Sequence, residues 1–145
     1  MGEVRFIGIV EETRDEKAKI RIYPEFKSGL KGIDGFSHII VLYWIHLRDT
    51  EKDRSTLLVY PRRHKVNIET GVFACRSPSR PNPIGLCVVK LLEVKDDSII
   101  VKGLDAIEGS PIVDIKPYIP AIDAVLDARI PKWLTSSTNS ENDRQ

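Results

Sequence analysis

A loop with three closely spaced prolines restricts how this chain can fold. The prolines lie between Gly71 and Gly85, in the sequence GVFACRSPSRPNPIG. Proline has no backbone N–H donor and fixes its own φ, so this stretch cannot form a paired central strand. Apolar residues precede it at Val72–Ala74 and follow it at Ile84–Val94. The pattern predicts a stiff loop that joins two strands of a core.

Two arginines, Arg76 and Arg80, lie inside this loop. Each guanidinium presents a planar fork of donors that suits a carboxylate or a phosphate. A structural role, in which both arginines pair with neighbouring carboxylates and hold the loop, is as compatible with these residues as a ligand-binding role.

Short strands are predicted along most of the chain. Ala18–Tyr23 alternates, with Ala18, Ile20 and Ile22 on one face. His38–Leu47 is almost continuously apolar, and its β-branched and aromatic residues favour a buried strand over a helix. Further strands are expected at Val4–Glu11, Thr56–Tyr60, Val72–Ala74, Leu86–Val94, Ile99–Lys102 and Ile112–Lys116. Seven or eight short strands without long intervening helices predict an all-β fold, a single closed or nearly closed β-barrel of about seven strands.

Three connecting or terminal segments give more specific expectations. Arg48–Arg54 is charged and is predicted to be an exposed connection. Gly103–Pro111 is predicted to be irregular, with two carboxylates that make it a candidate second wall of a site. In Ile112–Lys116 the alternation places Val113 and Ile115 on one face, and Asp114 and Lys116 on the face of Ile112.

The length of 145 residues predicts one domain, with residues 1–134 as the barrel. Residues 135–145 are too polar to bury against a core and are expected to be a disordered tail. No apolar run is long enough for a membrane span, and the first residues lack the apolar segment of a signal peptide, so a cytoplasmic protein without a membrane partner is expected.

The charge balance gives no global attraction to nucleic acid. Lys and Arg number 22 against 21 Asp and Glu, for a formal net charge of +1. Any nucleic-acid site must therefore be a local patch, and the densest basic run, Arg62–Lys65, is the best candidate for phosphate contact. A solvated basic loop is the alternative interpretation.

Several reaction classes lack the residues that they require. The sequence has no Walker loop, G-x-G-x-x-G, H-E-x-x-H or G-x-S-x-G motif. His38, His46 and His64 could bind a metal with Asp105 or Asp114, but no two histidines have the i,i+2 or i,i+4 spacing, so no metal site is expected. What remains is a site of loops, arginines and carboxylates, which suits a zwitterionic ligand.

Four ordered segments resemble the TrmO family. They are FACRSPSRPNPIGL at Phe73–Leu86, GLDAIEGSP at Gly103–Pro111, VDIKPY at Val113–Tyr118 and GFSH at Gly35–His38, within a match over Val4–Asp123. The resemblance implies a β-barrel that binds S-adenosyl-L-methionine, forms a homodimer, and methylates N6 of threonylcarbamoyladenosine at position 37, in the anticodon loop of tRNA. The chain resembles a short form that lacks the C-terminal domain, and Glu11–Lys17 is shorter than the loop in which bacterial members have a Pro-Arg-Gln segment.

The resemblance also implies residue roles. Chemistry rather than the resemblance suggests the catalytic residues: Asp114 or Tyr118 could accept the proton that the acceptor nitrogen loses. Arg76 could bind the methionine carboxylate, while Asp105 or Glu108 could bind ribose hydroxyls or the ammonium group. The cofactor-binding residues implied by position are Ile45, His46, Arg76, Leu86, Asp105, Glu108, Gly109, Ser110 and Pro111. Two other functions stay open: a regulatory module that binds S-adenosylmethionine without methyl transfer, and a small RNA-binding barrel without a cofactor.

Overall fold

The computed structural model describes residues 1–61 and 67–135. These residues belong to two compact units. The first unit comprises Met1–Leu47 and Ile84–Ile119, and the second comprises Arg48–Pro83 together with the chain from Pro120 onward. The basic run Arg62–Lys65 and residues 136–145 of the predicted tail lie outside the described residues, while Thr135 ends a short helix. The predicted domain limits stay a prediction.

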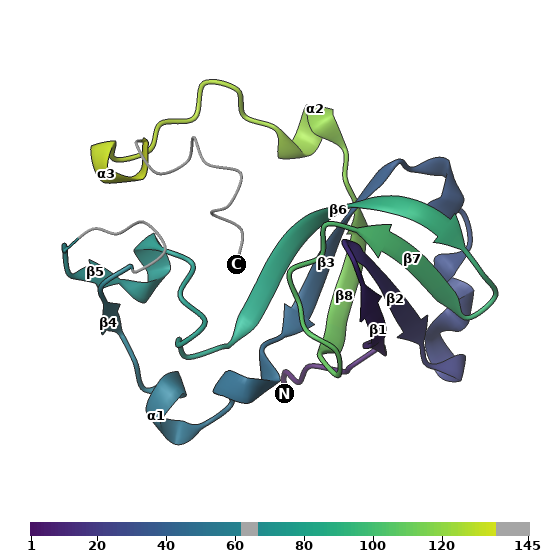
Figure 1. The fold of residues 1–145 in the computed structure, drawn as a ribbon, viewed down its shortest axis with the longest axis horizontal. Helices are drawn as coiled ribbons and strands as arrows, with labels where there is room; N and C mark the ends of the chain where they lie inside the picture. The colour runs from purple at the N-terminus through teal and green to yellow at the C-terminus, as the bar shows by residue number, and fades with distance from the viewer. Residues whose placement is uncertain (62–66, 136–145) are drawn as a thin grey trace. The chain divides into compact units, whose positions relative to one another are not determined.

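The first unit is a closed antiparallel barrel, which confirms the predicted fold class (Figure 1). The strands follow the order β1-β2-β7-β6-β3-β8 around the barrel, and β8 pairs with β1 to close it. Closure leaves no strand edge open to another chain. The strands are β1 (Gly8–Arg14), β2 (Lys17–Ile22), β3 (His38–Trp44), β6 (Ile84–Val94), β7 (Ser98–Lys102) and β8 (Pro111–Pro117).

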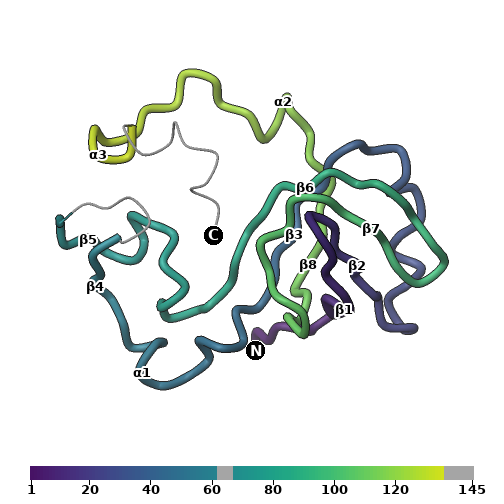
Figure 2. The backbone as a smooth tube through the Cα atoms, in the orientation of Figure 1, coloured from purple at the N-terminus to yellow at the C-terminus, as the bar shows by residue number. Residues whose placement is uncertain are grey.

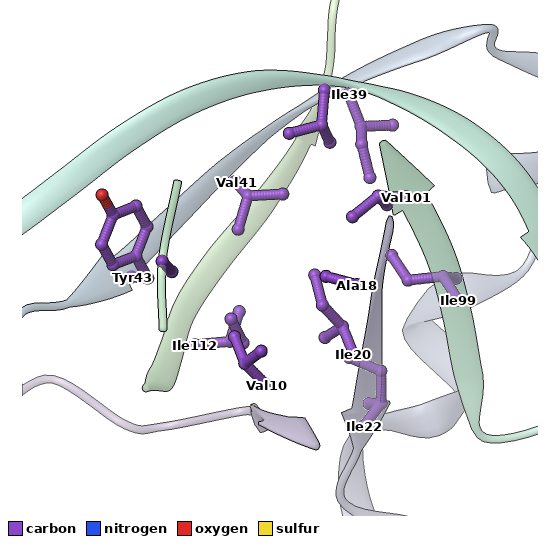
Figure 3. Close-up of a cluster of buried hydrophobic side chains, with 12 residues drawn as sticks. Val10, Ala18, Ile20, Ile22, Ile39, Val41, Tyr43, Ile99, Val101 and Ile112 are labelled. Atoms are coloured by element: carbon purple, nitrogen blue, oxygen red, sulfur yellow. The ribbon is translucent and has the colours of Figure 1, made fainter. Parts of the chain in front are cut away.

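Alternating side chains from these strands fill the barrel (Figure 3). In β2 the alternation predicted from the sequence is observed, because Ala18, Ile20 and Ile22 are buried. The core is almost entirely aliphatic, and most of its residues are β-branched, which suits strand geometry. The buried apolar side chains of this cluster are Val10, Ala18, Ile20, Ile22, Ile39, Val41, Tyr43, Val89, Ile99, Val101, Ala106 and Ile112.

The predicted alternation in β8 is wrong at its first residues. Ile112 is fully buried, whereas Asp114 is not, although both were expected on one face. The register between β3 and β8 shifts, from Leu42 opposite Asp114 to Tyr43 opposite Ile112. The extra residue in β8, Val113, interrupts the two-residue period, as in a β-bulge. The shift lets Ile112 lie in the core while Ile115, three residues later, also packs against it.

The remaining elements are short. In the first unit, η1 (Pro24–Leu30) and η2 (Ile33–Gly35) connect β2 to β3. The turn η3 (His46–Arg48) follows β3 and ends at the first residue of the second unit. The second unit contains α1 (Glu51–Arg54), the strand pair β4 (Leu58–Val59) and β5 (Thr70–Gly71), η5 (Val72–Ala74), α2 (Pro120–Asp123) and α3 (Lys132–Thr135). Within the described ranges, no helix has the length and apolar character needed to cross a bilayer.

The strand predicted at Val72–Ala74 is a 3₁₀ turn instead. The pairing of β4 with β5 extends over two residues, and the Val72 N–H then donates to the Leu57 carbonyl at 2.9 Å. Beyond Val72 the apolar residues do not enter a core, since Phe73 is 81% exposed. Apolar composition alone therefore predicted a strand where the structure offers no further partner strand among the described residues.

Helix α1 holds the proline-rich loop in the second unit, where an exposed connection had been predicted. The Arg54 Nε donates to the Pro81 carbonyl at 2.8 Å, and its Nη2 lies 3.4 Å from the Asn82 Oδ1. The Ser79 Oγ donates to the Asp53 Oδ1 at 2.6 Å, and the Arg48 Nη1 donates to the Ser79 Oγ at 3.1 Å. These contacts fix a segment that pairs with no strand among the described residues.

Asp53 is the centre of this attachment. Its N–H donates to the Thr50 Oγ1 at 3.1 Å and its Oδ2 accepts from the same hydroxyl at 2.8 Å, a reciprocal cap at the start of α1. The hydrogen bond from Ser79 lowers the pKa of the Asp53 carboxyl below its ordinary value of 3.8, and the bond from Thr50 and the Arg48 charge act in the same direction.

We expect Asp53→Asn to lower the melting temperature near neutral pH and to have a diminishing effect in acid. A carboxyl whose pKa is lower in the folded state stabilises the fold above its unfolded-state pKa, near 3.8, and loses this contribution as the pH falls through the folded value. Melting curves of both proteins from neutral pH to below the folded-state pKa measure this difference. The control is Glu51→Gln in the same helix, and a pH-independent difference for Asp53→Asn would contradict the assignment.

Candidate functional site

The connection from β7 to β8, residues 103–110, is the irregular segment that the sequence predicted, and it runs beside the barrel (Figure 2). The first residue of this segment is hydrogen-bonded both to the turn between β1 and β2 and to β6. The Gly103 N–H donates to the Glu16 carbonyl at 3.1 Å, and the Cys87 thiol of β6 donates to the Gly103 carbonyl at 3.2 Å. We call residues 103–110 the β7–β8 loop.

The end of the β7–β8 loop is attached to β1. The Gly109 N–H donates to the Val10 carbonyl at 2.8 Å, and the Val10 N–H donates to the Ser110 carbonyl at 2.9 Å. The Glu108 Oε1 accepts from the Thr13 N–H at 2.8 Å and from the Thr13 hydroxyl at 3.3 Å. One carboxylate oxygen of Glu108 is thus already used to hold the loop, which leaves the other for a ligand.

Two of the predicted cofactor residues, His46 and Gly109, lie together. Gly109 has a φ of +87°, a conformation that favours glycine, and a Cβ at this position would lie 3.9 Å from the His46 Nε2. Ser110 is 2% exposed, and Pro111 begins β8. The structure therefore brings the short helix after β3 next to the loop that precedes β8.

Asp105 is partly buried and faces β3. Its Oδ1 accepts a hydrogen bond from the Tyr43 hydroxyl at 2.7 Å. Tyr43 was not among the predicted site residues, because in the sequence it belongs to an apolar run that indicates only a buried strand. The signal that could have identified it is a phenol within that run, since a buried hydroxyl requires a partner.

The two apolar residues predicted for cofactor binding lie in different surroundings. Ile45, directly after β3, packs against the core. Leu86 on β6 is 46% exposed and pairs with Leu42, so its side chain lies on the outer face of the barrel. Leu86 is therefore not brought to the core side with Tyr43.

The two predicted catalytic residues are not brought together with the β7–β8 loop. Tyr118 follows β8, and its N–H donates to the His38 carbonyl at 3.1 Å. His38 begins β3, so Tyr118 lies about 17 Å along that strand from Tyr43. Asp114 lies opposite Leu42, accepts from the Ile115 N–H at 2.9 Å and forms an ion pair with Lys116 at 3.0 Å. Their catalytic role stays a prediction.

The two arginines of the proline-rich loop differ in what they contact. The Arg80 Nη1 donates to the carbonyls of Cys75 and Ser77, at 3.2 and 3.0 Å, so this guanidinium holds its own loop. Arg76 is exposed, and across residues 1–61 and 67–135 its side chain makes no hydrogen bond or ion pair. The structural role weighed for both arginines fits Arg80, with carbonyls in place of the expected carboxylates. Among the described residues, the Arg76 donors have no protein acceptor and are available to a ligand.

Each of these groups has the chemistry to bind part of a zwitterionic nucleoside ligand. In the second unit the exposed Arg76 guanidinium suits a carboxylate, and in the first unit the carboxylates of Asp105 and Glu108 suit hydroxyl or ammonium donors. In the described part of the chain, no three His, Cys, Asp or Glu side chains lie close enough to hold a metal ion.

Comparison with known proteins gives relatives in archaea and bacteria. A probable S-adenosyl-L-methionine-binding protein of Archaeoglobus fulgidus is 51% identical over 115 residues, which are 79% of this chain and 30% of that protein. One of Methanothermobacter thermautotrophicus is 47% identical over 76% of this chain and 75% of its own length. The tRNA (adenine(37)-N6)-methyltransferase of Escherichia coli is 40% identical over 83% of this chain and 52% of the enzyme.

A solved structure and a family model agree with these relatives. The crystal structure of TrmO from Pseudomonas aeruginosa superposes with a TM-score of 0.66 at 28% identity, over 89% of this chain and 61% of that one. The chain thus spans only part of several of its relatives. Residues 10–124 match the model of the tRNA-methyltransferase O N-terminal domain. The chain therefore belongs to the family of tRNA-methyltransferase O N-terminal domains.

Proposed function

We propose that this chain binds S-adenosylmethionine and transfers its methyl group to N6 of threonylcarbamoyladenosine at position 37 of tRNA. The main structural support is the contrast between Arg80, which holds the proline-rich loop, and Arg76, whose guanidinium is exposed in the same loop. The names of the archaeal relatives support the cofactor, and the name of the E. coli relative supports tRNA adenine 37 as the target.

Each binding group has a separate role in the proposal. Arg76 binds the methionine carboxylate through a charge-assisted pair of hydrogen bonds. Asp105 and Glu108 accept from the ribose hydroxyls or the ammonium group, and the attachments of the β7–β8 loop keep both carboxylates in place. His46 and the backbone of Gly109 and Ser110 form the wall of the site beside these two carboxylates.

S-Adenosylmethionine, when bound, supplies an electrophilic methyl group on a sulfonium. The contribution of the protein is then mainly to align the acceptor nitrogen, because an ordered approach replaces a bimolecular encounter. No strong base is required before the attack, and the nitrogen loses its proton afterwards.

We expect Arg76→Ala to weaken S-adenosylmethionine binding about tenfold or more without a change in melting temperature, since it removes a charge-assisted contact from an exposed loop position. Isothermal titration calorimetry measures the affinity. Arg129→Ala, at another exposed arginine of the second unit, is the matched control and should bind as the unmodified protein does. Equal affinity of Arg76→Ala and the control would contradict the role of Arg76.

We expect label from methyl-labelled S-adenosylmethionine to enter tRNA that contains threonylcarbamoyladenosine and not tRNA that lacks it. The two tRNA preparations differ only in the acceptor group, so the comparison tests the substrate directly. Binding of the cofactor without transfer to either tRNA would favour the regulatory alternative, which agrees with the names of the archaeal relatives. RNA binding without cofactor binding would favour the RNA-binding barrel.

We also propose a homodimer, supported by apolar side chains on the outer face of β6. Leu86 and Val88, opposite Leu42 and Ile40 of β3, are 46% and 39% exposed. Association would remove this apolar surface from water.

We expect sedimentation equilibrium to give a dimer, and Val88→Asp to shift it toward the monomer because burying an unpaired carboxylate is costly. Glu93→Asp, which keeps the charge of its position on the same strand, is the control. A monomeric unmodified protein would contradict the proposed assembly.

A further inference from the structure

Tyr43 is the one polar side chain in the otherwise aliphatic cluster of buried apolar residues described above. Figure 3 shows its ring at the edge of the cluster, with the hydroxyl directed away from the aliphatic side chains. A phenylalanine would fill the same space, while a hydroxyl taken out of water costs free energy unless it is hydrogen-bonded. The hydroxyl of Tyr43 donates to the Asp105 Oδ1 at 2.7 Å.

Gly85 makes this position of the ring possible. Gly85 is directly opposite Tyr43 in the pairing of β3 with β6. A Cβ on Gly85 would lie 2.7 Å from the Tyr43 hydroxyl oxygen and would overlap the ring. The ring therefore lies over a strand position that has no side chain, and three separate segments of the chain determine where the hydroxyl points.

The Asp105 carboxylate depends on Tyr43 for its orientation. The backbone of the β7–β8 loop is attached elsewhere, at Gly103 and at Gly109 and Ser110. In the described part of the chain no cation lies within ion-pair distance of Asp105, and its carboxylate accepts a side-chain hydrogen bond from Tyr43. A neutral donor fixes one oxygen and leaves the negative charge of the carboxylate without a paired cation.

We propose that Tyr43 is a positioning residue, which holds the Asp105 carboxylate so that its second oxygen accepts a hydrogen bond from a donor group of S-adenosylmethionine. This inference rests on the proposed function. Gly85 contributes by leaving room for the ring. Tyr43 and Gly85 thus set the orientation of the Asp105 carboxylate without contacting the ligand themselves.

A double-mutant cycle tests the inference. We expect Tyr43→Phe to weaken S-adenosylmethionine binding about tenfold, because a charged acceptor loses the bond that orients it. Asp105→Asn should weaken binding at least as much, and adding Tyr43→Phe to it should have little further effect. Isothermal titration calorimetry measures the four affinities, and the melting temperature of each protein is measured in parallel.

Matched controls separate this role from a purely structural one. Tyr23→Phe removes a hydroxyl from the first unit and should keep full affinity, since that hydroxyl makes no hydrogen bond among the described residues. Gly85→Ala displaces the ring and should weaken binding as Tyr43→Phe does, whereas Gly35→Ala, with open space around it, should not.

The outcomes are distinguishable. Unchanged affinity of Tyr43→Phe, or losses from Tyr43→Phe and Asp105→Asn that simply add, would overturn the role of Tyr43 while the unmodified protein still binds the cofactor. Absence of binding by the folded unmodified protein would instead overturn the proposed function, and the inference with it. If Tyr43→Phe fails to fold, the affinity of Gly85→Ala decides the question.

Discussion

Closure of the barrel between β1 and β8 is the constraint on which both the core and the candidate site depend. The strand pairing at this seam is short, with Gly8 opposite Ile112 and Ile9 opposite Pro111. Gly8 has to be small, because a Cβ there would overlap the Arg21 carbonyl of β2. Without this seam, β1 and β8 would each present an open edge, and Ile112 would no longer lie in a closed core.

The seam does not end where the strands end. Hydrogen bonds of Val10 with Gly109 and Ser110 continue the backbone ladder into the β7–β8 loop, and the Glu108 side chain adds contacts with Thr13. The segment that holds the candidate cofactor-binding carboxylates is thus part of the closure of the barrel. Backbone groups satisfied in this way leave the loop rigid, which reduces the entropy lost when a ligand binds.

The sequence predicted the barrel well where local pattern and tertiary environment agree. The alternation of Ala18, Ile20 and Ile22 follows from a strand with one buried face. The prediction from sequence failed where a partner strand decides the conformation. Val72–Ala74 is apolar but forms a 3₁₀ turn, because the described structure gives it no strand to pair with. The shift at Val113 depends on the register of β8 with β3. A one-residue shift in register moves the following side chains to the other face, and the pairing of β8 with β3 determines where that shift occurs.

The same reasoning explains which site residues could be found. The proline-rich loop and Gly103–Pro111 are visible because glycine, proline and charge interrupt the apolar pattern. Tyr43 is 62 residues from Asp105 and lies within an apolar run, so only the fold reveals their hydrogen bond. Likewise Arg76 and Arg80 are equivalent in sequence, and the hydrogen bonds of Arg80 to two backbone carbonyls distinguish them. Among the described residues, Arg80 satisfies its own loop, while the exposed Arg76 guanidinium keeps its donors for a ligand.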